Sequence, residues 1–446
     1  MDFTDLKKAL SRNDAGRAMY ELISKLYPIC RSITGNGVRE TLRLIQGHIP
    51  LSITEISSGT RVFDWTVPLE WNIRDAYITD ARGERIVDFK KNNLHVVGYS
   101  RPIKTKIGLK ELRDHLHTLP DHPDWIPYRT SYYKDAWGFC LTHRQYEQLR
   151  DEEYEVCIDS SLEQGHLTYG ECYLPGQTGD EVLISCHVCH PSLCNDNLSG
   201  TALATFLAKA LGSTSRRYSY RFIFIPATIG SIAWLSMNQS QTWRIKHGLV
   251  VTGVGDPGPS TYKKSRQGDA EIDRAMTHIL NHSGKEHRII DFFPYGYDER
   301  QYCSPGFNLP MGCFMRTPHG QYEQYHTSAD NLEFVQPSCL EESLWICLTT
   351  LCVLENNETF ISQNPFCEPQ LGKRGLYRAV GGQKEGALNE MALLWTLNLS
   401  DGQHSLLDIA ERAQLSFEAI ATAAETLTHH GLLTEWTSPG PSEVTQ

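Results

Sequence analysis

The sequence has little positive charge, and what it lacks removes several classes of function. Its 42 Lys and Arg residues are outnumbered by 53 Asp and Glu residues, which gives a formal net charge of −11. Nucleic acids and anionic membrane surfaces attract clusters of Lys and Arg. We therefore expect neither nucleic acid nor a membrane as a partner, and a small or cationic ligand is easier to accommodate.

A targeting segment and a disulfide pattern are also missing. The first eight residues carry no apolar stretch behind a basic start, and no uninterrupted apolar run is long enough to cross a bilayer. We therefore expect a cytoplasmic protein. The 13 cysteines are odd in number and scattered through apolar contexts, so most are expected to be reduced core residues.

The order of sequence patterns predicts a mixed architecture. Residues 15–50 have helical periodicity, and short alternating segments from 59 to 97 predict strands. Aromatic residues and prolines are dense from 119 to 138, which suits either an ordered loop lining a cleft or a packed aromatic cluster. From 155 to 255 strand and helix patterns alternate, which predicts an α/β fold with a mostly parallel sheet flanked by helices.

A Gly-rich linker at 371–386 precedes a C-terminal segment, whose helical pattern suits a winged helix. From residue 384 to the C-terminus there are two basic and nine acidic residues, a net charge of −7. This is the wrong sign for contact with phosphates. We expect the module to contact a protein partner or to dock on its own chain. A homo-oligomer is a further open alternative for the partner.

A strand, a polar loop and a helix follow one another in the most informative segment of the chain. The apolar run Val182–Ile184 leads to His187, Asp196 follows in the loop, and a helical pattern begins at Gly200. Loops that follow parallel strands lie at their carboxyl ends, where open α/β sheets place active sites. The segment therefore predicts an active-site loop.

Two imidazoles and one carboxylate are the candidate metal ligands: His187, Asp196 and the distant His326. This donor set suits zinc and leaves one position open for water or substrate, as catalytic zinc sites do. Taken alone, Asp196 is equally suited to be an N-cap for the following helix. His190 is either a further ligand or a contact to a neighbour or the substrate. The competing model is sulfur ligation by Cys186, Cys189 and Cys194.

Five segments resemble the zinc aminopeptidase superfamily, which includes leucyl-type aminopeptidases, glutamate carboxypeptidase and glutaminyl cyclase. The closest resemblance is to a bacterial subgroup of aminopeptidase-like proteins, and it covers nearly the whole chain. The segments are Tyr27–Gly35, Cys186–Gly200, Thr252–Gly258, Asp298–Gly306 and Tyr325–Asn331. The resemblance implies a catalytic domain from 1–58 and 156–365, an inserted β-rich domain at 59–155, and a winged helix at 384–440.

The resemblance also implies the metal content. By match, His187, Asp196 and His326 are the metal ligands. The superfamily usually holds a second metal through a Glu and an Asp on the next two strands, where this chain has Thr228 and Thr252. We therefore expect one zinc ion.

Position 227 departs from the subgroup, which has Phe-Ile-Pro-Glu-Thr-Ile-Gly where this chain has alanine in place of Glu. The missing Glu is the expected general base, and loss of such a group typically costs about 100- to 10,000-fold in rate. Ala227 has three open explanations: an engineered inactive variant, a natural pseudoenzyme, or replacement of the base by another group. The candidate replacements are His190, Asp256 and Glu299.

The resemblance further implies a substrate-binding turn at residues 298–302. In this interpretation Asp298 and Glu299 hold a substrate ammonium group, Arg300 binds a carboxylate or carbonyl, and Tyr302 faces an oxyanion. The alternative is a solvated loop held by salt bridges.

The sequence thus predicts a zinc-dependent hydrolase of the aminopeptidase type, inactive as written because of Ala227. Its expected substrate is a small peptide or amino-acid conjugate, cleaved at the amide bond beside a free amino group. The alternative hypothesis is a non-catalytic protein that binds zinc and a ligand and whose acidic winged helix contacts a protein partner.

Overall fold

The computed structural model describes residues 14–376 and 384–436, which form two compact units. One unit comprises the residues up to Asp273 together with Glu286–Trp345, and the other comprises Arg274–Lys285 together with the residues from Ile346 onward. Three predicted segments lie outside the described residues: the first eight residues, part of the Gly-rich linker (377–383), and the end of the expected winged helix (437–440).

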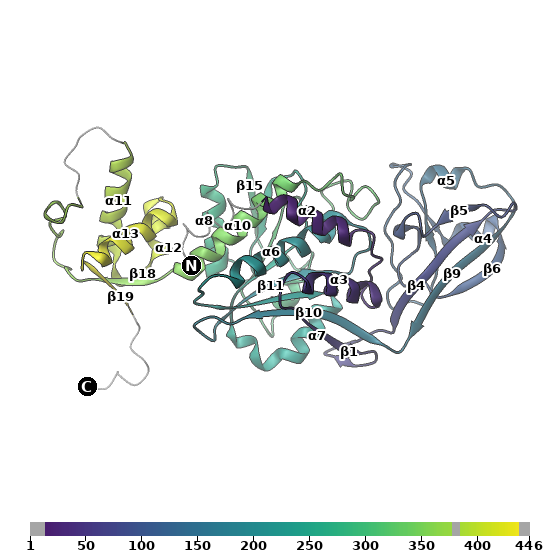
Figure 1. Cartoon of the computed structure of the whole chain (residues 1–446), viewed down its shortest axis with the longest axis horizontal. Helices are drawn as coiled ribbons and strands as arrows, with labels where there is room; N and C mark the ends of the chain where they lie inside the picture. The colour runs from purple at the N-terminus through teal and green to yellow at the C-terminus, as the bar shows by residue number, and fades with distance from the viewer. Residues whose placement is uncertain (1–13, 377–383, 437–446) are drawn as a thin grey trace. The chain divides into compact units, whose positions relative to one another are not determined.

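An eight-stranded mixed sheet organises the first unit (Figure 1). Its strands, in spatial order, are β1 (Ser52–Ser57), β10 (His166–Leu174), β12 (Ser219–Ile225), β11 (Glu181–His187), β13 (Ile245–Val251), β16 (Met311–Met315), β14 (Ser260–Lys263) and β15 (His287–Ile290). The central strands β12, β11, β13 and β16 are parallel, and antiparallel pairs join β1 to β10, β10 to β12, and β14 to β16. The predicted α/β sheet is confirmed, with its parallel part at the centre.

Helices cover both faces of this sheet because its central strands are apolar on both sides. All seven residues of β11 are buried, as expected for a central parallel strand. Figure 1 shows α6 (Gly200–Gly212) above the sheet and α7 (Ile229–Asn238) below it. Also in this unit are α2 (Ala15–Leu26), which packs on α6, α3 (Asn36–Gln46), which packs on β10, and α9 (Glu299–Tyr302).

Residues 59–163 add a β-rich module to the same unit. A four-stranded antiparallel sheet has the order β5 (Arg85–Asp88), β4 (Glu70–Thr79), β9 (Glu153–Glu163) and β6 (Ile103–Gly108), and a hairpin joins β2 (Arg61–Val62) to β3 (Trp65–Thr66). Shorter elements are α4 (Leu109–Leu112), β7 (Leu116–His117), β8 (Phe139–Cys140) and α5 (His143–Glu147). The boundary expected at residue 155 falls inside β9. One buried apolar cluster includes residues of both sheets, and a second, smaller cluster joins residues of the module to Leu193, so the module shares its core with the rest of the unit.

Among the described residues one helix, α10 (Pro337–Asn356), has the length and apolar composition of a membrane span. In the structure 72% of its most apolar window is buried, which is what a core helix shows.

The second unit contains the winged-helix arrangement predicted from the sequence. It has the helices α11 (Lys384–Leu399), α12 (Leu406–Ala413) and α13 (Phe417–His429), and a three-stranded sheet of β18 (Asp401–Ser405), β17 (Thr359–Ser362) and β19 (Leu433–Glu435). It also contains the part of α8 (Glu271–His282) that begins at Arg274.

Helix α8 binds the first turns of α12 and α13 within this unit. The Arg274 guanidinium lies 2.6 Å from the Asp408 carboxylate and 2.5 Å from the Glu411 carboxylate. One turn further along α8, His278 Nε2 accepts a hydrogen bond of 3.0 Å from the Phe417 amide. That amide is one of the first N–H groups of α13, which have no partner inside the helix. The N-terminal end of α13 is thus engaged by its own chain.

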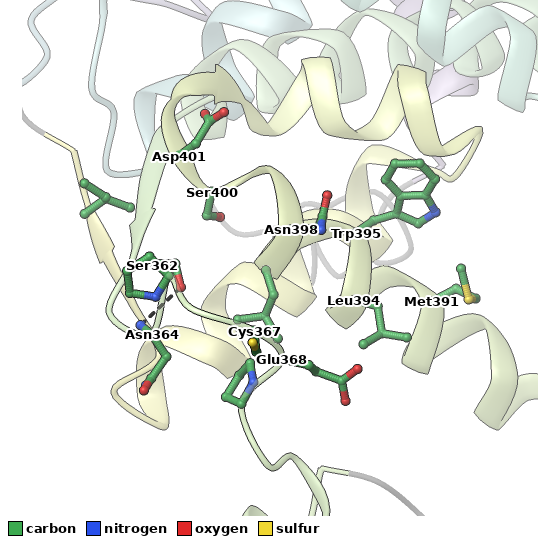
Figure 2. A pocket seen from close by; sticks show the side chains of 14 residues that line it. Ser362, Asn364, Cys367, Glu368, Met391, Leu394, Trp395, Asn398, Ser400 and Asp401 are labelled. Atoms are coloured by element: carbon green, nitrogen blue, oxygen red, sulfur yellow. Dashed lines mark hydrogen bonds between the residues drawn. The ribbon is translucent and has the colours of Figure 1, made fainter.

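A cavity of about 720 Å³ lies beside α11 in the second unit (Figure 2). Leu394 and Trp395 of α11 line it together with Ser362 and Asn364, which end β17 and follow it. Among the described residues, those that line this cavity include no Lys or Arg.

Candidate metal centre

The candidate site lies at the carboxyl ends of the parallel strands. His187 is the last residue of β11, Ala227 follows β12, and Thr252 follows β13. The chain passes from β11 to the neighbouring strand β12 and then crosses back over β11 to β13. Such a reversal of strand order is where open α/β sheets bind their ligands.

One buried carboxylate brings two of the predicted ligands together. Asp196 is fully buried; its Oδ1 lies 2.8 Å from His187 Nε2 and its Oδ2 lies 2.9 Å from His326 Nε2. Burial raises the pKa of this carboxyl group, but the neighbouring histidines outweigh burial and hold the pKa well below its usual range. Asp196 is therefore an anion with an imidazole at each oxygen.

His190 also lies among these donors. Its Nδ1 is 3.7 Å from Asp196 Oδ1, and the donor atoms of His187, His190 and Asp196 all lie within 4.8 Å of one another. His190 Nδ1 is buried without a hydrogen-bond partner. Burial lowers the pKa of His190 to about 3, against the pull of Asp196, so the ring is neutral and a nitrogen lone pair is available.

The donor set fits a zinc ion. Imidazole nitrogens and one carboxylate are ligands that zinc accepts, and an unpartnered buried nitrogen facing a carboxylate is what a metal would satisfy. Within the described residues, the three-residue cluster able to hold a metal contains His187, His190 and Asp196; His326 joins it through the second oxygen of Asp196. No cysteine belongs to this cluster. Burial raises the pKa of the Cys189 thiol to about 12, which disfavours the thiolate needed for sulfur ligation.

Side chains from two loops hold the ligands in place. The Asp330 carboxylate accepts hydrogen bonds from the backbone amides of Asn195 (2.6 Å) and Asp196 (2.9 Å). Asn197 Oδ1 accepts from the amides of Gly200 (3.1 Å) and Gly253 (3.2 Å). Position 200 needs glycine because a Cβ there would lie 2.5 Å from the Val251 carbonyl oxygen. The roles of Asp330 and Asn197 were not predicted, although both lie in segments that carry the resemblance.

Asp298 is a buried carboxyl group beside the turn that carries Ala227, the position of the missing base. Ser231, near the start of α7, places its hydroxyl 2.8 Å from Asp298 Oδ1 and 2.8 Å from the Thr228 carbonyl oxygen. Asp298 Oδ2 is buried without a hydrogen-bond partner. Burial raises the pKa of Asp298 to about 6, and the nearby His187 opposes part of this rise. Asp298 thus lies beside both the Ala227–Thr228 turn and a predicted ligand.

The other residues of the predicted substrate-binding turn form contacts within the protein. Glu299 is fully buried and forms an ion pair of 2.5 Å with Lys263. Tyr302 is fully buried, and its hydroxyl lies 3.0 Å from Ser185 Oγ. The Arg300 guanidinium lies 5.7 Å from the centre of the Tyr295 ring. These contacts stabilise the turn after β15. Among the described residues, Asp298 differs from Glu299 in that its carboxyl group has no Lys partner, accepts a hydrogen bond from Ser231 and is influenced electrostatically by His187.

Asp256, a candidate replacement for the base, is also committed to structure. Its carboxylate accepts hydrogen bonds from the Asn195 side chain (3.0 Å), the Gly258 amide (2.8 Å) and the Thr317 hydroxyl (2.5 Å). It therefore has no free oxygen to exchange a proton with a substrate.

Aromatic rings surround the imidazoles. Tyr325 stacks on its neighbour His326 at 4.0 Å between ring centres, and Tyr297 stacks on His187 at 5.6 Å. Tyr128, from the aromatic segment of the β-rich module, lies edge-to-face against both His190 (5.2 Å) and His326 (5.1 Å). Both interpretations of the aromatic segment thus apply in part: Tyr128 borders the imidazoles, and it also belongs to a small buried cluster that includes Ile126.

Comparison with known proteins is consistent with this architecture. Residues 20–357 match the model of a family described as a domain of unknown function (DUF4910), and residues 358–435 match a winged helix-turn-helix family. A protein of Clostridium acetobutylicum named "Putative polysaccharide biosynthesis protein with aminopeptidase-like domain" is 54% identical over 93% of this chain and 95% of its own length.

Solved structures show the same fold. A crystal structure of a "putative peptidase" from Clostridium acetobutylicum has a TM-score of 0.93 and 50% identity, covering 98% of this chain and 100% of that one. BSAP, a zinc aminopeptidase from Bacillus subtilis, has a TM-score of 0.57 and 12% identity, covering 76% and 94% of the two chains. At that identity the likeness shows the fold alone. The resemblance to aminopeptidase-like proteins is confirmed at the level of the fold, and the C-terminal winged helix is confirmed.

Proposed function

The chain belongs to the DUF4910 family, and from its aminopeptidase-like fold and its donor set we propose that it is a zinc-dependent hydrolase of the aminopeptidase type. The proposed substrate is a small peptide or amino-acid conjugate in the cytoplasm, cleaved at the amide bond beside a free amino group. One observation carries the proposal: the imidazoles of His187, at the end of β11, and of His326, 130 residues beyond Asp196, meet at the two oxygens of this buried carboxylate.

The residues that would hold the ion are His187, Asp196 and His326, with His190 within reach. A bound zinc ion supplies a Lewis acid that polarises a carbonyl group and makes water more acidic. The positions of Thr228 and Thr252 offer no carboxylate for a second ion, which supports the proposal of a single zinc.

Asp298 is the proposed proton-transfer group. Ala227 has no group that exchanges protons, whereas Asp298 is buried beside the same turn and has a free oxygen. A carboxyl group whose pKa lies near neutrality is suited to take a proton from water and return it to a leaving amine. Because Asp298 reaches the site from a different loop than the expected Glu, we expect slow turnover.

The name of the relative from Clostridium acetobutylicum directs the search for a substrate. It links that protein to polysaccharide biosynthesis, and we extend this link to the present chain as part of the proposal. Amino-acid amides of saccharides are therefore included among the substrates to be tested.

A second candidate function is a binding protein without turnover. It is favoured by Ala227 and by the acidic winged helix, whose helix α13 is engaged at its N-terminal end by His278. In this case the site binds zinc and an amine-bearing ligand, and the remaining acidic surface of the module contacts a protein.

The test combines metal analysis with a restored base. Purified protein is analysed for zinc by mass spectrometry and assayed on aminoacyl amides, with Ala227→Glu and the matched Ala227→Gln. We expect one zinc per chain, slow hydrolysis by the wild type, and an increase of about 100-fold or more with Glu but not with Gln. A zinc-loaded Ala227→Glu variant that binds aminoacyl amides without cleaving them would favour the binding protein, and a chain without zinc would refute both candidates.

A further inference from the structure

The β-rich module makes direct contact with the candidate metal centre through one short segment. The Tyr128 amide donates a hydrogen bond of 2.8 Å to the His326 carbonyl oxygen. Two residues away on each side, the Ser328 amide donates to the Ile126 carbonyl oxygen (2.8 Å), and the Ile126 amide donates to Ser328 Oγ (2.9 Å). Pro127 and Thr327 form an antiparallel bridge between these bonds. The module thus adds a short strand to the loop that carries a predicted ligand.

This pairing holds a backbone conformation that the ligand loop would not adopt readily by itself. His326 has a φ of 56°, in the left-handed region that is unfavourable for a residue with a side chain. The bond from the Tyr128 amide fixes the carbonyl group of this same residue. The surrounding structure therefore maintains the orientation from which His326 Nε2 reaches Asp196 Oδ2.

The Tyr128 side chain adds a contact to each of two imidazoles. Its ring is nearly perpendicular to the His190 ring (83°) and to the His326 ring (88°), with centres 5.2 and 5.1 Å apart. Tyr128 is 8% exposed, and its hydroxyl lies 3.2 Å from the Tyr132 hydroxyl. A ring held at both its backbone and its hydroxyl has little freedom to turn, so it limits rotation of the two imidazoles that it touches.

The Tyr128 hydroxyl is in turn connected to the core of the unit. The Tyr132 ring packs edge-to-face on Tyr99 at 5.2 Å, and the Tyr99 hydroxyl lies 2.6 Å from Thr34 Oγ1. Thr34 belongs to the segment between α2 and α3, outside the β-rich module. The support of the imidazoles therefore extends from the module into the helical part of the same unit.

We propose that Tyr128 is a positioning residue of the metal centre, and that the β-rich module completes this centre by holding His190 and His326 in their metal-binding orientation. The inference rests on the metal site of the proposed function, but it does not require hydrolysis. Residues that orient metal ligands typically contribute 10- to 100-fold to metal affinity.

The experiment measures zinc affinity in the full chain by competition with a chromophoric chelator. Tyr128→Leu removes the ring, and Tyr128→Phe keeps the ring but not the hydroxyl. Tyr133→Leu, which removes a half-exposed ring five residues further along the same segment, is the matched control. We expect Tyr128→Leu to weaken zinc binding 10- to 100-fold, Tyr128→Phe to weaken it less because the ring remains without its hydroxyl contact, and Tyr133→Leu to have no effect.

Thermal unfolding of the metal-free proteins separates positioning from a general loss of structure. A Tyr128→Leu protein with wild-type zinc affinity would overturn the proposal. Should Tyr128→Leu fail to fold, Ser328→Ala tests the same connection, because it removes one hydrogen bond of the added strand and leaves every ring in place. A drop in zinc affinity in that variant supports the proposal, and an unchanged affinity overturns it. Absence of zinc from the wild type is the distinct result that refutes the proposed function itself.

Discussion

The Asp330 carboxylate binds the backbone of Asp196 across 134 residues of sequence, with Oδ2 accepting the Asp196 amide at 2.9 Å. Its other oxygen accepts the Asn195 amide, and its own carbonyl oxygen accepts the Cys194 amide at 3.0 Å. Because Asp330 lies four residues after His326, this one side chain fixes two predicted ligands relative to each other.

Replacing Asp330 should therefore damage metal binding and stability together. Asp330→Ala leaves two buried amides without acceptors, and each such group costs about 1–3 kcal/mol. We expect a lower free energy of unfolding and zinc affinity reduced about 10-fold or more. Denaturant unfolding and chelator competition measure the two effects. Glu333→Gln, an exposed change in the same loop, is the control, and equal behaviour of the two variants would contradict this role.

Replacing His190 should show which of its two predicted roles it has, metal ligand or substrate contact. Its unpartnered Nδ1 lies near the other donors, so we expect His190→Gln to lower zinc affinity about 10-fold or more. His319→Gln is the matched control, because this imidazole packs against Tyr297 beside the site at 5.3 Å. Wild-type zinc affinity combined with a raised KM in His190→Gln would instead identify a substrate contact.

Asp298 should determine the acidic limb of the pH–rate profile. A base whose pKa lies at about 6 is protonated and inactive below that pH, so the wild-type rate should rise as the pH passes through 6. Asp298→Asn should lower the rate about 100-fold or more and remove this rise, with zinc content unchanged. Asp291→Asn, whose carboxylate is 94% exposed, serves as the control. An unaltered profile in Asp298→Asn would assign the proton transfer to another group.

His278 should make the second unit sensitive to acid. Burial, together with His282, lowers the pKa of His278 from 6.5 to about 4 in the folded chain. The unfolded chain therefore binds a proton first as the pH falls, and the stability contributed above pH 6.5 is lost as the pH approaches 4. Protonation also prevents Nε2 from accepting the Phe417 amide, which costs about 1–3 kcal/mol.

The matched variant for this test is His278→Gln, which offers an oxygen acceptor and does not titrate. We expect the wild type to lose more thermal stability than the variant between pH 7 and pH 4, as followed by circular dichroism of the full chain. Parallel pH dependence in the two proteins would show that His278 does not contribute.

The sequence was most informative where local pattern determines structure. A fully apolar run predicted the buried strand β11, and the change to helical periodicity at Gly200 predicted α6, so the position of His187 at a strand end followed from chain order alone. The convergence of His187, Asp196 and His326 in the structure agrees with the donors that their chemistry suggested. Their role as ligands stays a prediction.

Features that depend on contacts between distant segments could not be predicted from local sequence patterns. Asp298 and Glu299 are adjacent and chemically alike, yet Glu299 forms an ion pair with Lys263 whereas Asp298 accepts a hydrogen bond from Ser231 beside the Ala227–Thr228 turn. The partner of Tyr128 in the ligand loop lies about 200 residues away, and no periodicity indicates such a pair. Likewise, the acidic charge of the winged helix predicted its poor fit to DNA but not the contact between α8 and α13.

Strand β9 connects the β-rich module directly to the large sheet. It pairs with β4 and β6 along its length and is separated by only two residues from β10, which pairs with β1 and β12 in the large sheet. A pull on the β-rich module is therefore transmitted along a nearly continuous ribbon into the sheet whose strand ends carry His187 and Ala227. Removal of the module would also leave the His190 and His326 rings without their contact to Tyr128.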